Sequence, residues 1–160
     1  MKVTRTENQG SDSSSHQFLA FELGSETYGV PLLEVQEIRT YSPATSIPNA
    51  PDYVLGVINL RGSIIAVIDL RTRLGMPPMN EEDQSIVVVV NFDGKTFGLR
   101  GDSVSDVVEI ADDQVQPPPT ITIDETKRFL SGLAQLQDRV IILLDTTMVI
   151  DIDAVSQMVA

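Results

Sequence analysis

Carboxylates are the side chains of this sequence that could perform acid–base chemistry. Two pairs stand out, Asp112 with Asp113 and Glu34 with Glu37, and paired carboxylates can act as general acid and general base. The chain has 23 acidic residues, however, and solvated surface carboxylates are far more common than catalytic ones. Because nothing in the spacing isolates one pair, the sequence predicts no catalytic residue.

Nucleophilic and metal chemistry lack the side chains they need. The chain has no Cys, and its one His is His16, in a Ser-rich stretch. Thiolate catalysis, disulfides, thiolate metal sites and His-rich zinc sites are therefore excluded. The phosphate-binding patterns GxxxxGK[ST] and GxGxxG do not occur. We expect neither a metal nor a cofactor.

A single basic residue, Arg61, lies between two apolar blocks in residues 59–62 (NLRG). In one interpretation it is an exposed turn arginine, whose ion pairs contribute about 0–1 kcal/mol. In the other it pairs with Glu37 beside an apolar groove, where a guanidinium can hold a carboxylate in a defined geometry. The residues alone support both interpretations.

The composition limits the possible partners and location. The chain has 160 residues, of which 42% are hydrophobic, and a net charge of −12, which indicates one acidic globular domain. Such a surface repels phosphate backbones, so nucleic acid is a poor partner. The longest apolar runs have five residues, whereas a membrane span needs about 20. We therefore expect a cytoplasmic protein without direct membrane insertion.

The elements that must position these residues are strands. Short runs rich in Val and Ile, such as 64–68, 86–90 and 140–144, are separated by Gly and Pro turns, a pattern typical of an all-β fold. Five apolar residues in a row fit strands buried on both faces, as where two sheets or barrels pack together.

An internal repeat shows how the strands are organised. Residues 27–38 match residues 96–107 at a shift of 69 positions, including TYGV against TFGL. Residues 53–69 match residues 129–145 at a shift of 76 positions. In each half a Gly follows an aromatic residue, and this Gly permits a bulge or a close backbone approach. The repeat predicts two small β-barrels packed side by side.

The predicted organisation has a flexible tail over residues 1–16, a domain over 17–150 with a subdomain boundary near 80, and a tail or short helix over 151–160. We expect a helical turn at 32–35 before a strand from Gln36. We expect a short helix around 125–130 and another over 147–159. The last helix would place four apolar residues on one face: Met148, Ile152, Val155 and Val159.

Seven segments together resemble the CheW-like domains of bacterial chemotaxis coupling proteins. VQEIR and NLRG, in this order and at this separation, are specific to that family, and the match covers about residues 16–150. The segments are FLAFEL (18–23), YGV (28–30), VQEIR (35–39), GVINLRG (56–62), VIDL (67–70), VSDV (104–107) and LSGL (130–133).

The resemblance implies two SH3-like five-stranded barrels and a non-catalytic adaptor, monomeric when free. Such an adaptor joins the cytoplasmic tip of chemoreceptors, the methyl-accepting chemotaxis proteins, to the CheW-like regulatory domain of the histidine kinase CheA. It is cytoplasmic and is recruited to membrane-associated receptor arrays. Two alternatives remain open: an adaptor of another receptor–kinase array, such as one for surface motility, and a peptide-binding module.

The resemblance also implies a receptor-binding groove between the barrels, and it favours the Glu37–Arg61 pair. From composition alone, Val35, Val104 and Val107 would be core residues. Kinase contacts in the family use apolar barrel-end surfaces, to which no residue of this chain is assigned. The chain departs from the family at Arg100-Gly101, where members often have two apolar residues. The implied groove residues are Val35, Glu37, Arg61, Val104 and Val107.

Overall fold

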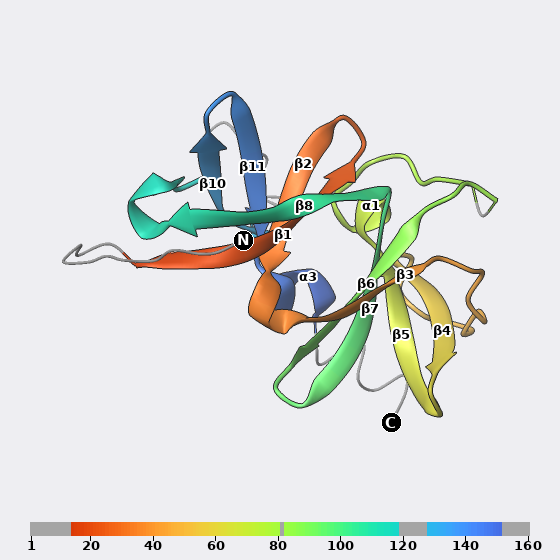
Figure 1. Cartoon of the computed structure of the whole chain (residues 1–160). Coiled ribbons are helices and arrows are strands. Elements are labelled where there is room, and N and C mark those ends of the chain that lie inside the picture. The colour runs from red at the N-terminus through yellow and green to blue at the C-terminus, as the bar shows by residue number, and fades with distance from the viewer. Residues whose placement is uncertain (1–13, 81, 119–127, 152–160) are drawn as a thin grey trace.

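Two curled β-sheets stand side by side in the computed structural model, which describes residues 14–80, 82–118 and 128–151 (Figure 1). Sheet I has the strand order β8-β1-β2-β11-β10-β9 and sheet II the order β3-β6-β7-β5-β4. The strands of sheet I are β8 (Ser103–Ala111), β1 (Ser15–Leu23), β2 (Glu26–Pro31), β11 (Arg139–Leu144), β10 (Leu130–Leu136) and β9 (Val115–Gln116). Those of sheet II are β3 (Val35–Thr40), β6 (Ile86–Phe92), β7 (Lys95–Gly101), β5 (Ser63–Asp69) and β4 (Val54–Leu60).

The all-β prediction with two repeat-related sheets is confirmed, and sheet I adds the two-residue strand β9 to the expected five. The sheets are not the two halves of the chain, however. Sheet I combines β1 and β2 with β8, β10 and β11 of the second half. The parallel pairs β2–β11 and β5–β7 join the halves, whereas the other strand pairs are antiparallel. A boundary near 80 therefore does not separate the sheets, because the chain crosses between them inside each repeat.

Three hydrophobic clusters explain the uninterrupted apolar runs. On β6, Val87 and Val89 belong to the interior of sheet II. Val88 and Val90, which point the other way, belong to a cluster that both sheets share. A third cluster fills the interior of sheet I. The prediction of burial on both faces is confirmed for β6, whereas the first residues of the other two runs, Ile64 and Val140, are 54% and 50% exposed. Full burial of each β6 valine contributes about 1.5–3 kcal/mol.

The repeated aromatic–Gly pairs lie where the two halves meet. Gly98 of β7 is paired with Val67 of β5, and a Cβ at Gly98 would lie 2.8 Å from Val87 Cγ1. At Gly29 of β2, a Cβ would lie 3.2 Å from Ile141 Cγ2. The expectation of close approach at these glycines is confirmed. A side chain at Gly98 would force a neighbour to move, and one at Gly29 would be in tight contact with Ile141.

Short helices occupy one of the crossings and several strand ends. The 3₁₀ helix η1 (Leu32–Glu34) precedes β3 and confirms the predicted turn, and a second one, η2 (Asp112–Gln114), follows β8. The sequence analysis missed α1 (Leu70–Arg73). This four-residue helix is too short for a periodic pattern, but the 76-residue shift relates it to α3 (Thr146–Ile150). Asp69 and Asp145 cap the two helices by accepting backbone N–H groups.

The predictions for the terminal segments need three corrections. Ser15 and His16 belong to β1 rather than to a tail, because the nine-residue strand β8 offers them partners. Helix α3 ends at Ile150, since Asp151 has the left-handed φ of 54°; residues 152–160 lie outside the described part. Residues 128–129 form a turn before β10, and the rest of the helix expected at 125–130 is likewise not described.

Candidate functional site

Val104 and Val107 lie on β8, the edge strand of sheet I, and their side chains share one face. Residues three apart on a regular strand point to opposite faces. Here the register with β1 shifts, because Ala20 is opposite Asp106 while Phe21 is opposite Val104. The extra residue, Ser105, forms a β-bulge, and such bulges re-aim side chains. The bulge turns both valines toward the side of β1 that faces sheet II.

The edge strand of sheet II, β3, has a β-bulge of the same kind. Val35 is opposite Val90 and Glu37 is opposite Val89, so Gln36 is the extra residue. Ile38 is opposite Val88, which belongs, like Val90, to the cluster shared by the sheets. Val35 and Ile38 therefore share the inter-sheet face of β3, as Val104 and Val107 do on β8.

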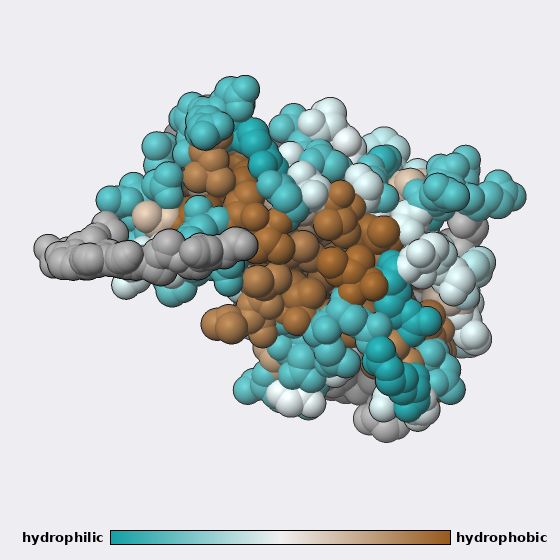
Figure 2. All heavy atoms as spheres, in the orientation of Figure 1, coloured by the Kyte–Doolittle hydropathy of each residue, from teal (hydrophilic) through white to brown (hydrophobic). Residues whose placement is uncertain are grey.

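These side chains form an exposed apolar surface, which we call the groove surface and define as Val35, Ile38, Val104 and Val107. Val104, Ile38 and Val107 are 38%, 42% and 47% exposed, while Val35 is half-buried against the shared core. Figure 2 shows hydrophobic side chains gathered in the middle of this face, over β8, β1 and η1 of Figure 1. Such a patch on a polar surface indicates an interaction site.

Glu37 and Arg61 form an ion pair across sheet II. Glu37 lies on the edge strand β3, and Arg61 lies in the turn between β4 and β5. Arg61 and Gly62 have φ values of 52° and 89°, typical of a two-residue type I′ hairpin. Asn59 Oδ1 accepts the Gly62 N–H at 2.8 Å. The turn thereby holds the mostly exposed guanidinium against the half-buried carboxylate.

The pair has an electrostatic signature. The hydrogen bond from Arg61 lowers the pKa of Glu37, and the charges of Arg61 and Arg39 act in the same direction against partial desolvation. Because the pKa of Glu37 is lower in the folded chain, the pair stabilises the fold at pH values above the ordinary Glu pKa of about 4.3. This stabilisation is lost as the pH falls through the lowered pKa.

We expect a carboxyl-detected NMR titration to give Glu37 a midpoint below that of an unpaired Glu. In Arg61→Gln the midpoint should move back up, because the main cause of the shift is removed. A Glu-containing model peptide titrated under the same conditions provides the reference for an unpaired carboxyl. A Glu37 midpoint unchanged by Arg61→Gln would show that the pair does not form in solution.

Sheet I carries a related ion pair. Asp106 on β8 is the repeat counterpart of Glu37, and Arg139 donates from Nη1 to Asp106 Oδ2 and from Nη2 to Asp106 Oδ1, both at 3.1 Å. These bonds lower the pKa of Asp106. The direct counterpart of Arg61 is Gln137, so the arginine has moved two residues along the hairpin. Each edge strand is thus tied to the hairpin tip of its own repeat.

A cleft of about 430 Å³ is lined by Arg39 and Asn59, each two residues along the chain from a member of the Glu37–Arg61 pair. Arg39 of β3 lines one side, and residues 57–59 of β4 with Ile64 of β5 line the other. A second cleft, of about 370 Å³, includes Arg73 and Arg128 with Asp52 as its acid. Neither of these two clefts holds a pair of carboxylates, so neither offers the arrangement that acid–base catalysis needs.

The predicted groove residues divide into two groups. Val35, Val104 and Val107 share the inter-sheet side of their strands, whereas Glu37 lies on the opposite face of β3 with Arg61. The sequence analysis missed Ile38 and Leu33. The 69-residue shift could have found Ile38, the counterpart of Val107. Leu33 is 98% exposed on η1, and no local pattern separates it from a core leucine.

The departure at Arg100-Gly101 does not add to the groove surface. Arg100 is 2% exposed and its guanidinium lies 4.0 Å from the Tyr41 ring centroid. Its Nε donates to Ser85 Oγ at 2.8 Å and its Nη2 to Asn80 O at 3.0 Å. Gly101 is buried, and a Cβ there would lie 3.1 Å from the Phe21 ring. This segment packs inward.

Comparisons with known proteins agree with this architecture. The model of the CheW-like domain family matches residues 17–154. The chain is 39% identical over 134 residues to chemotaxis protein CheW of Klebsiella aerogenes, covering 84% of this chain and 81% of that protein. It is 38% identical over 138 residues to a probable chemotaxis protein CheW of Rhizobium etli, with 86% of each chain covered.

A solved structure has the same fold. The scaffolding protein TtCheW of Thermoanaerobacter tengcongensis superposes with a TM-score of 0.75 at 34% identity, covering 82% of this chain and 90% of that one. The family match spans both sheets and every residue of the groove surface. The chain therefore belongs to the CheW-like domain family.

Proposed function

We propose that this chain is a non-catalytic scaffold that couples chemoreceptors to the histidine kinase CheA in bacterial chemotaxis. The observation that carries the proposal is the exposed groove surface, which lies between two repeat-related sheets in a member of the CheW-like family. A scaffold needs surfaces that bind partners, and it needs no reacting groups. The bulged edge strands supply such a surface.

A carboxylate enzyme is not supported. A general acid at neutral pH needs a raised pKa, but the pKa values of Glu37 and Asp106 are lowered by arginine hydrogen bonds. Both carboxylates act as ion-pair partners that hold hairpin tips in place. This role fits a rigid binding body.

The receptor tip would dock on the groove surface, with Glu37 and Arg61 at its side. Three half-exposed aliphatic side chains suit the apolar face of a helical partner. The Arg61 guanidinium is 69% exposed although it is paired, so it can also reach a polar group of the partner. Kinase binding would use a different surface of the same body.

Recruitment to a receptor array would come from these partners. Among the described residues, no helix has the length and apolarity to cross a bilayer. Contact with the membrane would come through the receptors that the scaffold binds.

Binding titrations with a chemoreceptor-tip fragment and with the CheA regulatory domain test the proposal. We expect Ile38→Ser and Val107→Ser each to weaken receptor binding about tenfold, since loss of one buried aliphatic contact costs about 1–3 kcal/mol. Kinase binding should change little. Val140→Ser is the matched control, because Val140 is 50% exposed but lies on β11, an interior strand of sheet I, and is not part of the groove surface.

Two results would contradict the proposal. If the wild type binds both partners but the groove variants bind the receptor normally, the receptor uses another surface. If the wild type binds neither partner but does bind isolated peptides, the chain is a peptide-binding module with the CheW-like fold.

Salt dependence gives a separate test. With a net charge of −12, the chain should attract basic partner surfaces through long-range electrostatics. We expect the association rate constant with the kinase domain to fall as ionic strength rises from about 0.01 M to 0.15 M, where the Debye length shrinks from about 30 to 8 Å. Stopped-flow measurements with a flat salt profile would exclude electrostatic steering.

A further inference from the structure

Asp102 forms the whole crossing from sheet II to sheet I. Strand β7 ends at Gly101 and β8 begins at Ser103, so a single residue joins the two sheets. Its backbone N–H donates to Glu22 O of β1 at 3.0 Å. This one-residue connection therefore has little conformational freedom.

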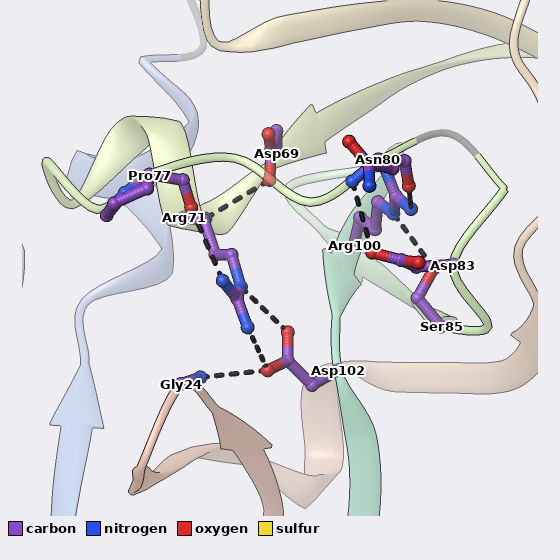
Figure 3. A network of polar contacts seen from close by, with 9 residues as sticks. All are labelled: Gly24, Asp69, Arg71, Pro77, Asn80, Asp83, Ser85, Arg100 and Asp102. Carbon is purple, nitrogen blue, oxygen red and sulfur yellow. Dashed lines mark hydrogen bonds and ion pairs between the residues drawn. The ribbon is translucent and has the colours of Figure 1, made fainter.

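The Asp102 carboxylate connects elements that belong to different sheets (Figure 3). Arg71 of α1, which follows β5 of sheet II, donates from Nη2 to Oδ2 at 2.6 Å and from Nε to Oδ1 at 3.1 Å. The Gly24 N–H, in the β1–β2 turn of sheet I, donates to Oδ2 at 2.9 Å. We call Arg71, Asp102 and Gly24 the inter-sheet clasp.

The geometry makes the clasp stronger than a surface ion pair. The side chains of Arg71 and Asp102 are only 23% and 18% exposed, and a two-pronged guanidinium–carboxylate contact fixes orientation as well as distance. Arg71 is also held by its Nη1, which donates to Pro77 O at 3.3 Å. The clasp therefore has little freedom to adjust.

Among the described residues, the other crossing has no guanidinium–carboxylate clasp of this kind. It runs through η1, and the 69-residue shift places Leu33 at the position of Asp102. Leu33 is 98% exposed. At η1, Thr146 Oγ1 of α3 donates to Glu34 Oε1 at 2.6 Å.

The sheets are also linked by their shared hydrophobic cluster and by hydrogen bonds from Arg73 of α1 to Val149 O and Met148 O of α3. The clasp differs from these links because Asp102 directly precedes β8, the strand that carries Val104 and Val107.

We propose that Arg71 and Asp102 are positioning residues for partner binding: they fix sheet I relative to sheet II, and so set the separation of the two edges of the groove surface. Val104 is two residues beyond Asp102 on β8, while Val35 and Ile38 lie on the other sheet. A small rotation at the crossing would move the two valines of β8 away from β3. Neither Arg71 nor Asp102 needs to touch the partner.

A distance measurement tests the clasp without any partner. The chain has no Cys, so Lys95→Cys on β7 and Gln135→Cys on β10 place one spin label on each sheet at exposed positions. We expect a narrow distance distribution by double electron–electron resonance in this background. Adding Asp102→Asn or Arg71→Gln should broaden or shift it, because the two-pronged contact is lost.

Thr72→Ala is the matched control. Thr72 lies next to Arg71 in α1, and its Oγ1 donates to Asp69 Oδ2 at 2.8 Å, so the variant weakens the same helix and leaves the clasp intact. It should keep the narrow distribution. The proposal is overturned if the clasp variants keep it too, or if Thr72→Ala broadens it equally.

The consequence for partner binding rests on the proposed function. Asp102→Asn should weaken receptor-tip binding at least about fivefold, the lower end of typical coupling between separate sites, while Thr72→Ala should not. A broadened distribution with unchanged receptor affinity would overturn the positioning role. If the wild type itself binds no receptor, the proposed function fails, and the distance measurement still decides whether the clasp sets the geometry of the sheets.

Discussion

Arg61→Glu is expected to reduce receptor-tip affinity about 100-fold while leaving CheA binding within about twofold. The substitution removes the exposed guanidinium and leaves two adjacent carboxylates to face the partner, and a charge mismatch across an interface costs several kcal/mol. The groove surface would then be flanked by an uncompensated negative charge. Isothermal titration against each partner separately measures both effects.

The charge swap Glu37→Arg/Arg61→Glu separates the pair from its individual members. If the two side chains act through their mutual contact, the double variant should recover at least about tenfold of the lost affinity, as a double-mutant cycle would detect. If the double variant recovers no receptor affinity, the partner contacts Arg61 directly. Equal loss of receptor and kinase binding would instead indicate a general disturbance of sheet II.

Gly56→Ala is expected to be among the most destabilising single substitutions in the chain. Gly56 lies at the register shift of β4, has a φ of 145°, and a Cβ there would be 2.1 Å from the Thr45 carbonyl oxygen. Both the backbone conformation and the contact exclude a side chain. We expect a loss of about 3 kcal/mol or more in the free energy of unfolding, measured by urea denaturation.

Gly62→Ala is the control for the backbone contribution. Gly62 also has a positive φ, 89°, but nothing lies within 4 Å of its Cβ position. It should therefore show only the left-handed penalty of about 1–2 kcal/mol. Equal losses in both variants would show that the contact with Thr45 relaxes in solution. Gly132, the repeat counterpart of Gly56, has a similar constraint from Val115 Cγ1 at 2.6 Å and Gln116 O at 2.9 Å.

The site was only partly predictable. The sequence could predict Val35, Val104 and Val107 as groove residues, because both the repeat and the family resemblance point to these positions. The sequence could not show that Val104 and Val107 share one face, because an unbroken two-residue period places them on opposite sides of a strand. The bulge at Ser105 exists only in the pairing with β1. Ile38 was within reach of the repeat, since the same bulge recurs at Gln36.

The Glu37–Arg61 ion pair also could not be established from the sequence alone. The sequence allowed an exposed turn arginine or a partner for Glu37, and neither local pattern nor charge distinguished them. Only the folding of sheet II brings the β4–β5 turn against its far edge strand β3. The same applies to Asp102 and Arg71, which are 31 residues apart.

The sequence by itself determined that the chain is built mainly of short strands, where many of the turns fall, and that one plan is used twice. These properties are local: β-branched runs, Gly and Pro positions, and a constant shift are readable from neighbouring residues. The tertiary structure decided which strands share a sheet. The pairing of β2 with β11 and of β5 with β7 depends on hydrogen bonds between distant segments, and no local preference specifies such partners. The groove surface and the clasp lie where these long-range pairings cross, so only the folded chain defines them.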